Sequence, residues 1–487
     1  MKIRHALLTC FAASVTLALS ACDDSGRNAP VRVSVIGESK EIMAPLTHIG
    51  STAGQTVFVA TGQGLVTHNA NGDVVPGLAQ RWIVMDDGGS YIFRLRRAQW
   101  ANGDRVDAKD VKRLIEARLK VAAREDPYGS LASVAEVMAM TGDVLEIRLQ
   151  APRPNFLMAL AEPEMGIAQK DGGSGPYRKA VNRDGSGTLL LTPADYLRDP
   201  EDPERPSDRR IVRAERAAKA IVRFREGDSD LVLGGTLADL PYLTLTEIDD
   251  NAVRFDPVQG LFGLAMTSSN PMFDDPHVRE ALSMAIEREA IIGYFAVSRW
   301  KIADRILPQQ YNLPRPPSGP GWSGRPIEER RNLAIGIIAR WQAQHGGKPV
   351  ELTVELPKGP GMDLLFLALK LQYKMVGVEL KRVDRRGDLR LIDEVAPYDS
   401  AAWYLSRLSC VRGLHCSKEA EDLLKLSMTT ESMSDRLELL GQAEPLMVAH
   451  GGYIPLAMPV RWSLVAPRLK GFVPSPRGFH NLRWLLR

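Results

Sequence analysis

Cysteine and histidine are the residues of this sequence whose types and spacing most clearly permit chemistry. Four cysteines are present, and two of them, Cys410 and Cys416, enclose five residues that end in His415. Two cysteines this close form a disulfide in an oxidising compartment. A metal site made by both thiolates and His415 is the alternative, but the second half of a zinc site is missing there. We therefore expect a disulfide between Cys410 and Cys416, and no metal.

The other two cysteines, Cys10 and Cys22, lie in an N-terminal segment with the pattern of an export signal. Two basic residues precede an uncharged, largely apolar run of sixteen residues over 6–21. This run is shorter than the roughly 20 residues of a membrane-spanning helix, whereas it fits the apolar part of a secretory signal. We predict that residues 1–21 are a signal peptide, so that Cys10 is absent from the mature chain.

Cys22 directly follows this run and is the candidate site of lipid attachment. The sequence Leu19-Ser20-Ala21-Cys22 resembles the lipobox of bacterial lipoproteins, in which small residues precede a cysteine that takes a diacylglycerol on its thiol. Acyl chains hold a protein at a membrane without a spanning helix. The resemblance implies cleavage before Cys22 and a polar tether over 22–30. An ordinary secretory signal that happens to contain a cysteine is the alternative.

The bulk composition is that of a globular protein. The 487 residues include 62 basic and 59 acidic side chains, and 44% of the residues are hydrophobic. This length allows two or three domains, and the near balance of charge gives no indication of nucleic-acid binding.

Catalytic motifs are absent from the sequence. We find no His-Glu-x-x-His, no Gly-x-Ser-x-Gly and no phosphate-binding loop, and none of the eight histidines lies four residues from another. We expect neither an enzyme nor a bound cofactor.

Strand and helix patterns are mixed along the mature chain. Residues 31–36 and 91–96 alternate as half-buried strands do, and Asp107 is placed to cap a helix with an apolar stripe. Later, a strand over 350–356 precedes an apolar helix around 364–375. These patterns predict an α/β protein with more than one lobe.

An ordered series of motifs adds a specific resemblance. It includes Gly64-Leu65-Val66, Val75-Pro76-Gly77-Leu78-Ala79, Trp82, Asp87-Gly88, Trp100, Gly103, Ala108-Lys109-Asp110-Val111, Gly173-Ser174-Gly175-Pro176-Tyr177 and Phe273-Asp274-Asp275-Pro276. This series resembles the peptide, dipeptide and nickel-binding family (family 5) of bacterial ABC-transporter extracytoplasmic solute-binding proteins. The resemblance extends over nearly the whole mature chain.

The resemblance implies a two-lobed, periplasmic-binding-protein-like (Venus flytrap) α/β fold with an extra inserted domain. The chain would cross between the lobes near 262 and 460, and these crossings would act as a hinge. We expect lobe I over 31–61, 166–262 and 462–487, the inserted domain over 62–165, and lobe II over 263–461.

The function implied is capture of peptides or related small solutes in the cleft between the lobes. A lipid-anchored monomer in the periplasm, on the outer face of the inner membrane, would deliver them to the permease and ATPase subunits of an ABC importer. A ligand sensor or chaperone on the same fold is the alternative, and an enzyme is a weaker one.

The family holds extended peptides mainly by their main chain, and it pairs the free amine with an aspartate in a Trp-rich loop entered from a strand. The corresponding stretch here is Tyr398–Cys410, in which the usual Asp-Tyr-x-Asp-Pro-like sequence is absent. No acidic residue occurs over 404–418, where Arg407 and Arg412 are basic. Either Asp399 or a residue elsewhere takes the acidic role, or the ligand has no free amine.

We predict an anionic or amine-poor ligand, whose carboxylate could bind Arg407 or Arg412. The alternative is that these arginines are solvated loop residues that do not contact the ligand. Trp403, Tyr404 and Arg407 are the candidate ligand contacts. Trp100 and Tyr177 are secondary candidates, for which packing in a core or a turn is the alternative.

Overall fold

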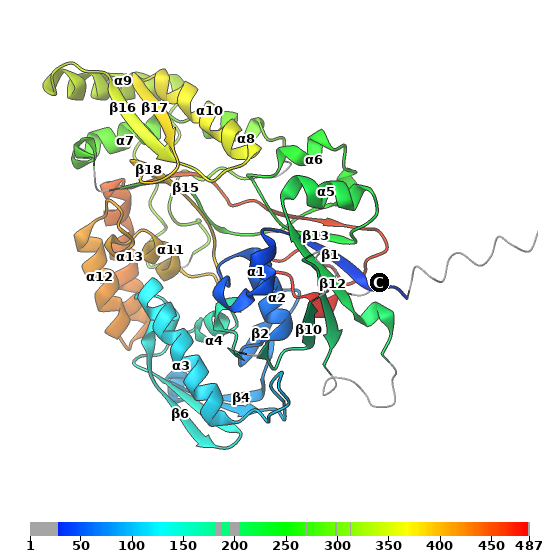
Figure 1. Ribbon diagram of the computed structural model, residues 1–487. Coiled ribbons are helices and arrows are strands. Elements are labelled where there is room, and N and C mark those ends of the chain that lie inside the picture. Colours follow the sequence, from blue (N-terminus) through cyan, green and yellow to red (C-terminus); the bar gives the residue numbers. More distant parts are fainter. Residues whose placement is uncertain are drawn as a thin grey trace, which may run out of the picture.

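The computed structural model describes residues 28–170, 172–181, 187–194, 204–267, 270–297, 300–311 and 313–485 (Figure 1). The predicted signal peptide and Cys22 lie outside the described residues, so cleavage and lipidation stay predictions. None of the described helices combines the length and the apolar character that crossing a membrane demands.

A seven-stranded sheet forms the core of lobe I. Its central strands β12, β1 and β13 are parallel, and β1 presents Val31, Val33 and Val35 to the interior. The strand order is β10 (Tyr177–Val181), β11 (Leu189–Pro193), β12 (Arg210–Glu215), β1 (Val31–Ile36), β13 (Leu231–Thr236), β20 (Arg461–Val465) and β14 (Val253–Phe255). The helices of this lobe are α1 (Ser39–Met43), α2 (Thr52–Thr61), α5 (Ala217–Arg225) and α6 (Pro241–Leu245).

A five-stranded sheet forms the core of lobe II. The strand order is β17 (Val378–Val383), β16 (Val350–Glu355), β18 (Leu389–Val395), β15 (Gly260–Met266) and β19 (Tyr453–Ala457). The helices are α7 (Pro276–Met284), α8 (Arg288–Gly293), α9 (Ile327–Gln344), α10 (Pro360–Lys374), α11 (Ala401–Arg407), α12 (Lys418–Thr429) and α13 (Met433–His450). The side chain of Asp275 caps α7 by accepting the amide of His277, with Pro276 in the first turn, as the sequence predicted.

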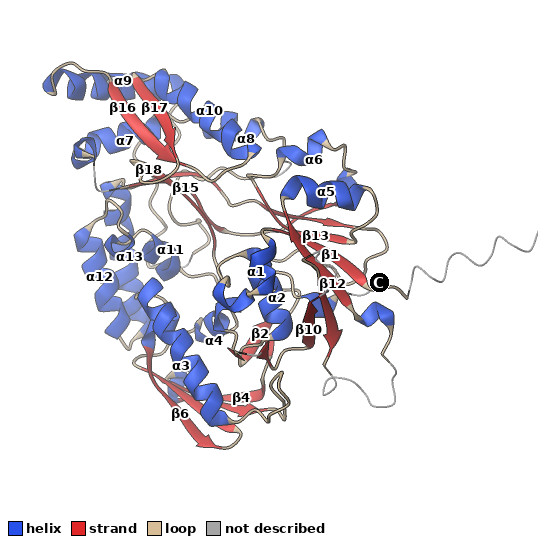
Figure 2. Ribbon diagram, in the orientation of Figure 1, coloured by secondary structure: helices blue, strands red, loops and turns tan. Residues whose placement is uncertain are grey.

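The chain crosses between the two sheets twice. The first crossing lies between β14 and β15, over residues 256–259, and the second lies between β19 and β20, over residues 458–460. Helices and strands are mixed in both lobes (Figure 2), so the structure is a two-lobed α/β fold.

A third unit follows α2 and has its own hydrophobic core. Its sheet has the order β4 (Ala79–Met85), β5 (Ser90–Leu95), β7 (Val144–Leu149) and β6 (Val134–Thr141), and a two-stranded ribbon pairs β2 (Val66–His68) with β3 (Val74–Pro76). Helix α3 (Ala108–Glu125) begins at Asp107, whose side chain accepts the amides of Lys109 and Asp110. The predicted helix cap is therefore confirmed. The unit ends with α4 (Phe156–Leu160), and we call residues 62–165 the inserted domain.

The inserted domain is joined to lobe I and lies close to lobe II. In Figure 1 the cyan α3 lies next to the orange helix α12 of lobe II, and Tyr128, which follows α3, donates a hydrogen bond to Glu421 of α12. After the inserted domain, β8 (Ala168–Gln169) and β9 (Gly172–Gly173) form a short ribbon that returns the chain to lobe I. The inserted domain therefore adjoins both lobes.

Candidate functional site between the inserted domain and lobe II

One strand of lobe II has an open edge. Strand β15 pairs with β18 along its whole length, but β16 pairs with β18 only at Leu389 and Arg390. Because β16 ends at Glu355, residues 392–395 of β18 have no strand on that side among the described residues. An unpaired strand edge offers backbone donors and acceptors to another extended chain.

The backbone groups at this edge follow from the pairing with β15. The amide of Ala396 donates to the carbonyl oxygen of Gln259 over 2.8 Å, and backbone direction alternates along an antiparallel strand. The N–H and C=O groups of Asp393 and Val395 therefore face the open edge, as does the C=O of Leu391. The N–H of Leu391 is used in the pairing of Glu355 with Arg390. Arg461 already occupies part of it, because its Nη2 donates to the carbonyl oxygen of Asp393 over 3.1 Å.

Two cavities adjoin this strand. One of about 380 Å³ is lined by residues 390–394 and Arg412. The other, of about 530 Å³, lies between the inserted domain and lobe II, and Val395 and Arg412 are among its lining residues. The open edge of β18 therefore leads from one cavity to the other.

The wall that the inserted domain contributes to the larger cavity is acidic. Glu125, Asp126, Glu162 and Glu164 all line it. Burial raises the pKa of Glu164 to about 7, and the negative charge of Glu162 acts in the same direction. The Oε1 atom of Glu164 also accepts a 2.6 Å hydrogen bond from Gln55 of lobe I. Near neutral pH this wall therefore carries less negative charge than its four carboxyl groups suggest.

The opposite wall contains the two arginines singled out in the sequence, and both have a counter-ion. The Nε atom of Arg407 lies 3.1 Å from Oε2 of Glu394, and Nη2 of Arg412 donates to Oε1 of the same carboxylate over 2.7 Å. The guanidinium of Arg407 also lies 5.4 Å from the ring centre of Trp403, a cation–π distance. Neither arginine is a freely solvated loop residue.

The three candidate ligand contacts differ in whether they reach the wall of the larger cavity. Trp403 and Arg407 line the larger cavity, although Trp403 is only 2% exposed. Tyr404 is fully buried behind them and packs edge to face against Tyr311, with ring centres 5.4 Å apart. The structure therefore brings Trp403 and Arg407 to the cavity wall and leaves Tyr404 as their support.

The secondary candidates are core residues. Trp100 is buried in the core of the inserted domain, and Tyr177 in the core of lobe I. Asp399, the possible acidic partner of an amine, accepts a 3.1 Å hydrogen bond from Nη1 of Arg477. Neither aromatic ring lies on the cavity wall described above.

The stretch Tyr398–Cys410 was expected to correspond to a Trp-rich loop entered from a strand. Strand β18 does lead into it, but the expectation of a loop is wrong. Residues Ala401–Arg407 form helix α11, and all but the last of them are buried. A helical backbone is not extended, so this segment cannot pair with a peptide as a neighbouring strand does. The strand that can do so is β18, which ends just before the predicted stretch.

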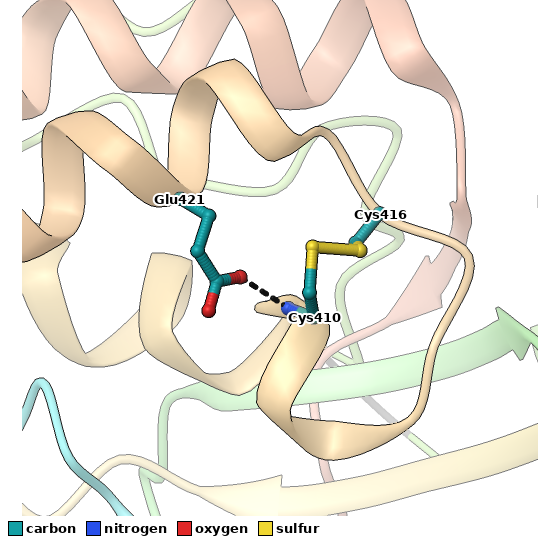
Figure 3. A group of neighbouring side chains, drawn as sticks. All are labelled: Cys410, Cys416 and Glu421. Carbon is teal, nitrogen blue, oxygen red and sulfur yellow. Dashed lines mark hydrogen bonds between the residues drawn. A yellow bond between two sulfur atoms is a disulfide. The ribbon is translucent and has the colours of Figure 1, made fainter.

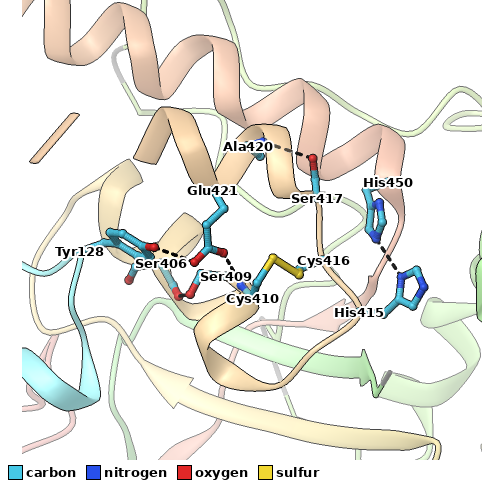
Figure 4. The surroundings of a disulfide bond; sticks show 10 residues. All are labelled: Tyr128, Ser406, Ser409, Cys410, His415, Cys416, Ser417, Ala420, Glu421 and His450. Carbon is cyan, nitrogen blue, oxygen red and sulfur yellow. Dashed lines mark hydrogen bonds between the residues drawn. A yellow bond between two sulfur atoms is a disulfide. The ribbon is translucent and has the colours of Figure 1, made fainter. Parts of the chain in front are cut away.

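A disulfide joins Cys410 and Cys416 immediately after this helix (Figure 3). Glu421 completes a group that is close enough to hold a metal ion, but the joined sulfurs supply no thiolate ligands. His415 turns away from the sulfurs, and its Nδ1 lies 2.8 Å from Nε2 of His450 (Figure 4). The metal alternative that uses His415 is therefore not assembled in this structure.

Comparison with known proteins agrees with this architecture. A family model described as bacterial extracellular solute-binding proteins, family 5 Middle, matches residues 73–332. The dipeptide-binding protein DppE of Bacillus subtilis is 22% identical over 468 residues, which cover 87% of this chain and 86% of DppE. Such relatives are named as binding proteins and not as enzymes.

Solved structures show the same fold. The Haemophilus influenzae OppA complex with the peptide RPPGFSPFR has a TM-score of 0.77 at 17% identity and covers 94% of this chain and 99% of its own. The murein tripeptide binding protein MppA of Escherichia coli has a TM-score of 0.78 at 20% identity, covering 94% and 98%. The unliganded open form of MppA scores only 0.64. The family match extends over more than half of the chain, and the chain therefore belongs to the bacterial extracellular solute-binding proteins of family 5.

Proposed function

We propose that this protein captures peptides or closely related solutes between its lobes and delivers them to the permease of an ABC importer. In this proposal it acts as a monomer in the periplasm, held by a lipid on Cys22 to the outer face of the inner membrane. The two crossings between the sheets serve as the hinge. A lipid anchor keeps the binder concentrated near its permease.

The observation that carries the proposal is the open edge of β18 inside a cavity. Within the described part of the chain, residues 392–395 have no neighbouring strand on one side, and the cavities of about 380 and 530 Å³ adjoin this edge. An extended peptide would pair its main chain with Asp393, Val395 and the carbonyl oxygen of Leu391. Its side chains would point alternately to the two sides of the new strand, where the cavities leave room for them. This mode of binding depends little on the peptide sequence.

The charged groups near the edge could bind the charged ends of the ligand. We propose that a ligand carboxylate binds Arg407 or Arg412, competing with Glu394 for them, and that Trp403 contacts the neighbouring part of the ligand. Tyr404 supports both from behind. An amine held by Glu162 or Glu164 is the second candidate, favoured by the acidic wall of the larger cavity.

Two measurements test the proposal. Native mass spectrometry of the protein purified from its host should show a bound mass in the range of short peptides; protein that carries no peptide and binds none would refute it. Calorimetric titration with trialanine, its N-acetyl form and its C-terminal amide then identifies the end groups. We expect N-acetylation to be tolerated and amidation to weaken binding, whereas a strict need for the free amine would favour the acidic wall.

A further inference from the structure

The inserted domain is fastened to lobe I by more than its two chain connections. Gln55 of α2 donates to Glu164 over 2.6 Å. The guanidinium of Arg118, on α3, lies 5.4 Å from the ring centre of Phe58, on α2. When the lobes rotate about the crossings at 256–259 and 458–460, the inserted domain should therefore move with lobe I.

The same domain also contacts lobe II. The hydroxyl of Tyr128 donates a 2.6 Å hydrogen bond to Oε1 of Glu421 (Figure 4). The guanidinium of Arg153 donates to the carbonyl oxygen of Met428, further along α12. Residues of both units line the larger cavity, and these bonds join the same two units outside its lining. They can persist only while the inserted domain rests on lobe II.

Glu421 is held in place from the side of lobe II. It lies in the first turn of α12, and its Oε2 accepts the backbone amide of Cys410 (Figure 3). Cys410 begins a short turn, Cys410–Arg412, and its disulfide to Cys416 ties that turn to the segment just before α12. One carboxylate thus accepts from lobe II with one oxygen and from the inserted domain with the other.

We propose that Glu421 and Tyr128 form a latch that holds the cleft closed, and that the disulfide keeps the latch in position. This inference rests on the proposed function, since a latch matters only where closure retains a solute. The closed form then has a hydrogen bond from Tyr128 to the charged carboxylate of Glu421. In the open form both groups bind water instead. Tyr128 and Glu421 are positioning residues and need not touch the solute.

Two single variants break the latch by removing few atoms. Tyr128→Phe deletes the donor, and Glu421→Gln removes the charge and one of the two acceptor oxygens. Tyr294→Phe is the matched control for the first, because Tyr294 is 61% exposed. Glu419→Gln is the control for the second, because Glu419 is exposed in the same first turn of α12.

Release of a fluorescently labelled peptide pool from a casein digest is the functional readout. We expect about tenfold faster dissociation from either variant, the change that loss of one such bond produces, and no change in the controls. The double variant should be no faster than the single ones, because both remove the same bond. Unchanged dissociation from Tyr128→Phe would overturn the latch.

The disulfide is tested by reduction with dithiothreitol. The dithiol gives up two electrons and becomes a cyclic disulfide, while Cys410 and Cys416 become two thiols. Reduction should make release of the peptide faster from the wild-type protein. It should not accelerate release from Tyr128→Phe, which already lacks the latch. Equal acceleration in both proteins would mean that the disulfide acts independently of the latch.

Hydrogen exchange of the segment 398–412 provides a readout that needs no solute. Faster exchange in both latch variants than in their controls is expected, and identical exchange would contradict the latch. If the wild-type protein binds nothing in the peptide pool, the proposed function fails while this measurement still decides the latch.

Discussion

The amide of Gly361 donates a 2.9 Å hydrogen bond to the carbonyl oxygen of Ala238, and this bond joins the start of α10 in lobe II to lobe I. The approach is so close that a Cβ atom at position 361 would lie 1.8 Å from the carbonyl oxygen of Leu237. Residue 361 lies in the first turn of α10 and its φ is not positive. Glycine is therefore needed at position 361 because the two lobes pack closely there, and not because its own backbone conformation requires it.

We therefore expect Gly361→Ala to push the lobes apart at this point. The clash should lower the free energy of unfolding by about 1–3 kcal/mol, as overpacked sites do, and change the radius of gyration measured by small-angle scattering. Gly336→Ala in α9 is the control, because no atom lies within 4 Å of a Cβ there. An alanine at 361 that changes neither quantity would show that the backbone relaxes without moving the lobes.

A proline at position 395 tests the open edge of β18. The N–H of Val395 faces the edge and not β15, and the residue before it is already in a strand, as proline requires. We expect Val395→Pro to weaken peptide binding about tenfold or more by removing a donor and crowding the edge. The melting temperature should change little.

The neighbouring position supplies the contrast. The N–H of Glu394 faces β15, so Glu394→Pro should break the sheet and lower the melting temperature strongly. If Val395→Pro proves equally destabilising, the assignment of the open edge is incorrect.

The local features of the fold were readable from the sequence because they depend on neighbouring residues. Asp107 and Asp275 are short acceptors placed just before apolar helical stripes, and both cap their helices in the structure. The two-lobed α/β fold followed from the order of motifs along the chain. Such signals need no knowledge of which segments meet in space.

The site was less predictable because it depends on distant pairings. The open edge exists only because β16 ends opposite Arg390. The sequence of β18 itself does not indicate where β16 ends. Similarly, Arg407 and Arg412 looked unpaired over 404–418, yet their counter-ion is Glu394, on the preceding strand.

Helix α11 was missed for a different reason. Its sequence over 401–405, Ala-Ala-Trp-Tyr-Leu, is a short apolar run, and periodicity cannot distinguish a buried strand from a buried helix over so few residues. Nearly every side chain of α11 is buried, so no polar face marks its period. Its tertiary packing decided the conformation.

The disulfide should contribute modestly to stability. It closes a loop with a sequence separation of six residues, and loop closure this short is worth about 2 kcal/mol. We expect the Cys410→Ser, Cys416→Ser double variant to lose about that much free energy of unfolding in urea. Treatment of the wild-type protein with a reductant should have the same effect, and the double variant should not respond to it. A much larger loss would indicate that the disulfide supports the fold of lobe II beyond its own loop.

The pair formed by His450 and His415 should make stability depend on pH. Burial lowers the pKa of His450 to about 4. The positive charge of Arg279 and, to a smaller extent, that of His415 lower this pKa as well. Asp274 lies nearby, with Oδ1 3.7 Å from Nε2 of His415, and it opposes the lowered pKa of that histidine. Because the unfolded chain takes up a proton near pH 6.5 and the folded protein only near pH 4, the stabilisation is complete above pH 6.5. It is lost progressively as the pH falls from 6.5 towards 4.

Urea unfolding at pH 7.5 and pH 4.5 measures this effect. Other groups also titrate in this range, so the relevant quantity is the difference between the wild-type protein and His450→Gln, which we expect to depend less on pH. His277→Gln is the control, since His277 is an exposed histidine at the start of α7. If the wild-type protein and His450→Gln lose the same stability between the two pH values, His450 takes up its proton equally well in the folded and unfolded chains. The two partly buried histidines would then contribute nothing to the pH dependence of stability.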